Sequence, residues 1–181
     1  MNELQSLTGQ SQAFENQVLE RLNVGRSVRC LLIAAVEMLA DAVNMLVEQV
    51  FRKDDYAVKY AVEPLLHGDG PLAKLSVRLK LIYGLGVINR HEYEDCERLM
   101  ALREALNHDG SEYRFTDDEI VGPISALHCM STLPAFPDFA SHDAELRVMQ
   151  QQRYQQVVRS TMVLSLTALI SRLSLRRAFK K

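Results

Sequence analysis

One segment of the chain, residues 27–52, restricts the fold more than any other. Its apolar residues recur at steps of three and four, so that they cover most of a helical circumference. Its polar residues follow steps of four, three, four and four, which place them in one narrow stripe: Glu37, Asp41, Asn44, Glu48 and Arg52. A helix with so much apolar surface must be surrounded by other helices. We therefore expect residues 27–52 to form the centre of a helical bundle.

Capping and breaking residues divide the rest of the chain into further helices. A first amphipathic helix is expected from Ser11, and Asp54 or Asp55 can cap a third. Pro71 can open a fourth, because its missing N–H costs nothing at the first helical position. Asn89 and Thr116 each precede a glutamate by three residues, the spacing of a capping box.

The last predicted helix is also the longest, running from about His142 to Arg177. No alternating pattern typical of strands and no internal repeat is present. A length of 181 residues suits one domain with its own core. We predict an all-α, single-domain multi-helix bundle over residues 1–181, with a long C-terminal helix.

The charge balance argues against an autonomous DNA-binding protein. Lys and Arg number 21 against 23 Asp and Glu, for a net charge of −2, whereas phosphate contacts supply most of the affinity of a DNA binder. The start of the chain lacks the basic and apolar regions of a signal peptide. The most apolar stretch, residues 30–36, is followed by Glu37 and Asp41 and is too short to span a membrane. We expect a cytoplasmic protein.

Neither a metal site nor a cofactor site is indicated. Cys30, Cys96 and Cys129 are far apart, and isolated cysteines are usually buried as small apolar groups. The five histidines show no ligand spacing, and no glycine-rich phosphate loop follows a predicted strand.

A helix-turn-helix is the first candidate for nucleic-acid binding, and the helices on either side of residues 84–89 are the pair to consider. The second of them begins with four carboxylates, which would repel phosphates: Glu92, Glu94, Asp95 and Glu97. Basic residues occur in two other places. Lys74 and Arg78 are expected on an ordinary solvated face, and the arginines near the end of the last helix stand where the helix dipole favours cations. The candidate nucleic-acid contacts are Lys74, Arg78, Arg172, Arg176 and Arg177.

Arg103 and His108 form a second candidate site. They are separated by four residues, a spacing similar to the R-x4-H motif of the HEPN helical ribonucleases. A histidine can act as general base toward a 2′-hydroxyl, while an arginine stabilises the phosphate transition state. Glu104 stands where that family often has Asn, Asp or His, and a surface role for both residues is the alternative.

Six segments resemble the mannitol operon repressor family, and together they cover most of the chain after the first dozen residues. They are Val50–Leu66, Gly68–Leu72, Leu75–Arg90, Leu106–Gly110, Phe115–Ile120 and Arg153–Ser171. The resemblance implies negative control of genes for mannitol uptake by the phosphotransferase system and for its metabolism. It supplies no binding residues to carry over by position.

The resemblance and the charge balance together favour repression through a protein partner. We expect contact with another transcriptional regulator or a phosphotransferase-system protein, with operator DNA bound indirectly. Direct DNA binding is the alternative, and an RNA-binding or ribonuclease domain using Arg103 and His108 is the second. We expect no enzymatic activity, no cofactor and a homo-oligomer, since closed symmetric assemblies are common.

Overall fold

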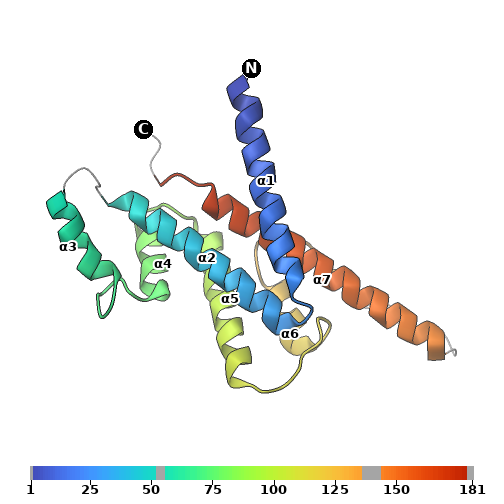
Figure 1. Cartoon of the computed structure of the whole chain (residues 1–181). Helices are drawn as coiled ribbons and strands as arrows, with labels where there is room; N and C mark the ends of the chain where they lie inside the picture. Colours follow the sequence, from blue (N-terminus) through green and yellow to red (C-terminus); the bar gives the residue numbers. More distant parts are fainter. Residues whose placement is uncertain (1, 52–55, 136–143, 179–181) are drawn as a thin grey trace.

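Every regular element in the described part of the chain is an α-helix. The structure, a computed structural model, describes residues 2–51, 56–135 and 144–178 (Figure 1). Its helices are α1 (Asn2–Val24), α2 (Val28–Val50), α3 (Tyr56–Leu66), α4 (Leu75–Gly84), α5 (Arg90–His108), α6 (Asp118–Ser125) and α7 (Ala144–Ser174). The all-α prediction is confirmed, and so is the long C-terminal helix, because α7 has 31 residues.

Helix α2 lies at the centre, as its apolar circumference predicts. It packs against α1, α4, α5 and α7, and 11 of its 23 residues are buried. Glu37, Asp41 and Glu48 of the polar stripe are exposed. Each fully buried Leu or Val contributes about 1.5–3 kcal/mol relative to exposure, so this helix is the largest single contributor to the core.

Two of the expected helix starts are confirmed by hydrogen bonds. The Ser27 hydroxyl accepts from the Cys30 N–H at 3.1 Å, which caps α2. The Asn89 side chain accepts from the Glu92 N–H, and the Glu92 carboxylate accepts from the Asn89 N–H, both at 3.0 Å. This capping box places Glu92 in the first turn of α5, facing the core.

Three expected helix starts are wrong. Helix α1 begins before Ser11, because no proline interrupts the preceding residues. Pro71 lies in a turn, where the following Leu72 N–H donates to the Leu65 carbonyl at 2.9 Å and prevents a helical conformation. Asp117, rather than Thr116, occupies the N-cap position of α6. The predicted positions Arg52, Asp54, Asp55 and His142 lie outside the described residues.

Arginine side chains hold the connections between helices by donating to backbone carbonyls. The last carbonyls of a helix have no partner within it, and the arginine fork satisfies several of them at once. Arg159 of α7 donates to Asn23 and Gly25 at the end of α1, at 3.2 and 3.1 Å. The arginines that donate to carbonyls in this way are Arg29, Arg78, Arg98, Arg159 and Arg176.

Helix α7 packs along only part of its length. Its buried residues begin at Val158, whereas residues 144–153 are all exposed, and Figure 1 shows this end projecting from the bundle. By length and composition alone, α2 and α7 could each cross a membrane. However, 56% of the apolar window of each is buried inside the bundle, as in core helices of soluble proteins.

Candidate interaction surface

A buried carboxylate joins the start of α5 to the end of the chain. Glu92 is 1% exposed, and Arg176 donates to its two oxygens at 2.6 and 2.7 Å. Arg172 forms an ion pair with the same carboxylate, with its Nε 2.9 Å from the nearer oxygen. We call Glu92, Arg172 and Arg176 the glutamate cluster.

The cluster keeps Glu92 ionised despite its burial. Burial raises the pKa of the carboxyl, but hydrogen bonds from Arg176 and the Asn89 N–H, with the charges of both arginines, lower the pKa overall. Arg176 also donates to the Val87 carbonyl at 3.0 Å, which ties the α4–α5 connection to the end of α7. The cluster is therefore a structural link.

A second buried carboxylate fixes the segment after α6. Asp95 is 1% exposed and accepts hydrogen bonds from the N–H groups of His128 and Cys129, at 2.7 and 2.8 Å. Burial raises the pKa of the Cys96 and Cys129 thiols to about 12, so these thiols are unreactive. Cys30, in contrast, is exposed, which corrects the expectation that it is buried.

The acidic start of α5 is less exposed than its sequence suggests. Glu92 and Asp95 face inward, and Glu94 accepts hydrogen bonds from Arg90 at 2.6 Å and from the His128 ring at 2.8 Å. These two bonds lower the pKa of Glu94 to about 2. Glu97 accepts from the Tyr93 hydroxyl, which raises the pKa of that hydroxyl to about 12. The prediction that all four carboxylates are available to repel phosphates is therefore wrong for Glu92 and Asp95, which are buried.

The five candidate nucleic-acid contacts do not form one surface group. Arg78 donates to the Leu72 carbonyl at 2.6 Å, and also to the Asn44 side chain and the Leu66 carbonyl, so it holds the α3–α4 connection. Arg172 and Arg176 belong to the glutamate cluster. Lys74 and Arg177 are exposed. Their role in nucleic-acid binding stays a prediction.

Arg103 and His108 lie near the end of α5 and face different directions. Five residues along an α-helix turn by about 140° from the starting direction. The His108 ring is exposed and within hydrogen-bond distance of the Glu104 carbonyl, at 2.9 Å. The Arg103 Nε is buried without a hydrogen-bond partner in the described part of the chain. A joint site would need a second chain, and the ribonuclease role stays a prediction. The described residues contain no cluster of metal-ligating side chains.

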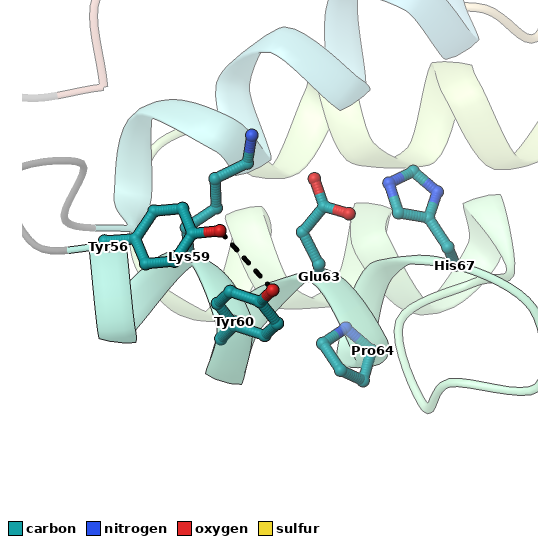
Figure 2. A pocket seen from close by; sticks show the side chains of 6 residues that line it. All are labelled: Tyr56, Lys59, Tyr60, Glu63, Pro64 and His67. Atoms are coloured by element: carbon teal, nitrogen blue, oxygen red, sulfur yellow. Dashed lines mark hydrogen bonds between the residues drawn. The ribbon is translucent and has the colours of Figure 1, made fainter.

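An exposed aromatic face on α3 was not identified from the sequence. Tyr56 and Tyr60 are 73% and 66% exposed, and their rings meet edge to face with centroids 4.9 Å apart. Together they line an open pocket of about 510 Å³ on this helix (Figure 2). The residues of this tyrosine face are Tyr56, Lys59, Tyr60, Glu63, Pro64 and His67. Two tyrosines four residues apart, which share one face of a helix, were the signal available in the sequence.

A second hollow, of about 360 Å³, lies between α2 and α3. Its apolar lining comes from Phe51, Val62 and Leu66, and Glu48 of α2 contributes a carboxylate. It shares Lys59, Glu63 and His67 with the tyrosine face, so these three polar residues form a ridge between the two depressions. We call the second depression the α2–α3 hollow.

Comparisons with known proteins agree on one family. The family model of the mannitol repressor (MtlR) matches residues 14–174. The mannitol operon repressor of Escherichia coli K12 is 70% identical over all of this chain and 93% of its own length. Fumarase E of Escherichia coli K12 is 27% identical over 88% of this chain and 96% of its own length.

Two solved structures have the same fold. One is the MtlR–HPr complex from Escherichia coli, with a TM-score of 0.86 and 74% identity over 90% of this chain and 99% of that chain. The other is YggD of Shigella flexneri 2a, described as a possible transcriptional regulator. It has a TM-score of 0.74 and 26% identity, over 88% of this chain and 98% of that one.

Proposed function

Because the chain belongs to the mannitol repressor (MtlR) family, we propose that it represses the mannitol operon by binding a protein of the phosphotransferase system. The relative solved with HPr supports this class of partner. A repressor that responds to such a carrier would act in the cytoplasm, which is where we propose this chain acts.

The observation that carries the proposal is how the candidate DNA-binding arginines are used. Arg172 and Arg176 bind a carboxylate that is 1% exposed, and Arg78 donates to the backbone of the α3–α4 connection. A cation held in this way would have to break internal bonds before it could neutralise a phosphate. Repression through a protein partner does not require these arginines to break their internal bonds.

The tyrosine face is the contact surface that we propose for the partner. Tyrosine is among the residues that dominate the energy of protein interfaces, because it buries a large area at low entropic cost. Helix α3 uses none of its described residues in the buried core. The ridge of Lys59, Glu63 and His67 would supply polar contacts at the edge of the apolar area.

Calorimetric titration with purified HPr tests both the partner and the surface. Tyr60→Ala should raise the dissociation constant by about 30-fold, the effect of losing one interface hot spot. Leu164→Ala is the matched control, since Leu164 is 60% exposed on α7, outside the proposed surface. Absence of binding by the unmodified chain would contradict the partner. Equal loss in both variants would contradict the tyrosine face.

Direct DNA binding is tested by titrating operator DNA with the purified chain at low and moderate salt. We expect no sequence-specific complex without a protein partner. Lys74→Glu and Arg177→Glu are the informative reversals, because both side chains are exposed and neither belongs to the glutamate cluster. Tight specific binding that these reversals abolish would replace our proposal with direct repression.

We also propose that the chain is not an enzyme. Two reactions deserve an assay: fumarate hydration, because a relative carries that name, and RNA cleavage, because of Arg103 and His108. We expect the rate of each to equal that of a sample without protein. RNA turnover that disappears in His108→Ala, or measurable fumarate hydration, would overturn this part of the proposal.

A further inference from the structure

Helix α3 is attached to the bundle by little apolar packing. None of its described side chains is buried, and only Val62 and Leu66 are half-buried. No pair of closely packed helices in the described part of the chain includes α3, which stands at the edge of the molecule near the end of α2 (Figure 1). The α2–α3 hollow, about 360 Å³ in volume, lies between the two helices. Apolar packing therefore fixes the position of α3 only weakly.

Arg78 of α4 supplies polar contacts where this packing is missing. Its guanidinium donates to the Leu66 carbonyl at the end of α3 and to the Leu72 carbonyl in the following connection, the latter at 2.6 Å. The same group donates to the Asn44 side chain of α2. A guanidinium holds its N–H donors in a fixed planar arrangement, so one side chain sets the direction from α2 to the end of α3. Arg78 is half-buried, which limits the competition of water for these bonds.

The connection that follows α3 folds back tightly on the last turn of the helix. The Leu72 N–H donates to the Leu65 carbonyl at 2.9 Å, and a Cβ atom added to Gly70 would lie 2.3 Å from the Pro64 carbonyl oxygen. Pro64 has no N–H for the carbonyl four residues earlier, so α3 lacks one internal hydrogen bond at this point. We expect the turn and the helix to move together, because they are joined closely to each other and only weakly to the core.

We propose that α3 and its turn form an arm that opens from the bundle as a separate unit, and that Arg78 is the positioning residue that holds it closed. Opening releases the guanidinium from the Leu66 and Leu72 carbonyls and exposes the apolar lining of the α2–α3 hollow. The buried core stays intact, because no described side chain of α3 belongs to it. Units with few buried contacts open at a lower free energy than the whole fold.

The arm affects partner binding in a way that rests on the proposed function of the tyrosine face. The closed arm presents Tyr56 and Tyr60 in the orientation that Arg78 fixes, so a partner that binds this form loses affinity as the closed fraction falls. Arg78→Met should therefore raise the dissociation constant for HPr by about threefold to tenfold. Arg78→Lys should have an intermediate effect, because it retains the charge but donates from a single nitrogen.

Hydrogen exchange of the full chain tests the arm without any partner. In the unmodified chain, the amides of α3 should exchange at least about 100-fold faster than those of α2. In Arg78→Met they should exchange about tenfold faster again, while α2, α5 and α7 keep their protection. Arg98→Met is the matched control, because Arg98 donates in the same way to the Ala126 carbonyl, at 2.6 Å, after the end of α6. This control should leave the exchange of α3 unchanged.

Three exchange results would overturn the proposal. Equal protection of α3 and α2 in the unmodified chain would show that α3 opens only with the whole fold. Unchanged exchange of α3 in Arg78→Met would show that Arg78 does not hold the arm, and loss of protection in α2 would show that it supports the core.

The HPr titration separates the arm from the proposed function. Tighter binding by Arg78→Met would show that HPr selects the open arm, which would overturn the positioning role. If the exchange results are as expected but HPr binds both chains equally, or binds neither, the arm stands and only the proposed function of the tyrosine face fails.

Discussion

The glutamate cluster and the ridge of Lys59, Glu63 and His67 both combine a carboxylate with basic side chains. The groups are paired in the cluster and, among the described residues, unpaired along the ridge. In the cluster, one buried carboxylate is bound by Arg172 of α7 and by Arg176, which follows the end of that helix. Along the ridge, residues at i, i+4 spacing could pair with each other. However, none of the three side chains forms an ion pair or hydrogen bond with another described residue.

This difference separates charges that hold the fold from charges that are available to a partner. Removing a group from the cluster leaves the opposite charge buried and unpaired, which is costly. Removing a side chain from the ridge leaves no unpaired charge inside the protein. Stability measurements should therefore respond to the cluster, and binding measurements to α3.

The largest expected effect on stability is that of Glu92→Gln. The neutral amide has no negative charge to pair with Arg172 and Arg176. It is also a weaker acceptor than the carboxylate for the Asn89 N–H of the capping box. We expect the free energy of unfolding to fall by about 3 kcal/mol. Urea unfolding measures this change, with Glu97→Gln, an exposed position on the same helix, as the control. A change below 1 kcal/mol would mean that the cluster behaves like a surface ion pair.

A smaller effect is expected for Asp95→Ala. The substitution leaves the N–H groups of His128 and Cys129 without their acceptor. Both are only partly buried, so water can replace part of what is lost, and we expect the free energy of unfolding to fall by about 1–2 kcal/mol in total. The loss should be local. Hydrogen exchange should speed up at His128 and Cys129 while the amides of α2 remain protected, and simultaneous loss of protection in α2 would contradict this.

The pH dependence of stability should come from the same helix. The folded pKa of Glu92 and Glu94 is lowered, so the unfolded chain binds more protons and their contribution is complete above the unfolded pKa, near 4.5. It is lost as the pH falls from about 4.5 toward the folded pKa, about 2 for Glu94. Thermal unfolding between these limits should show a steep loss of stability that is shallower in Glu92→Gln.

Local patterns predicted the helices, but not what their side chains contact. The apolar circumference of residues 27–52 identified the central helix, because burial on all sides leaves a pattern in one segment. The capping box of Asn89 was visible for the same reason. The link from Glu92 to Arg176 joins residues 84 positions apart, and no local spacing encodes it. The arginines therefore looked like surface cations in the sequence.

The smallest expected effect on stability is that of Tyr60→Ala, and it tests the comparison most directly. The ring is 66% exposed, and its contact with Tyr56 lies on the surface, so its removal should change the free energy of unfolding by less than about 0.5 kcal/mol. Urea unfolding of this variant, beside the HPr titration, separates the two roles. If Tyr60→Ala unfolds as easily as Glu92→Gln, then α3 supports the core, and its lost binding would reflect a damaged fold. If the free energy of unfolding is unchanged while the affinity for HPr falls, Tyr60 contributes to partner binding and not to the fold.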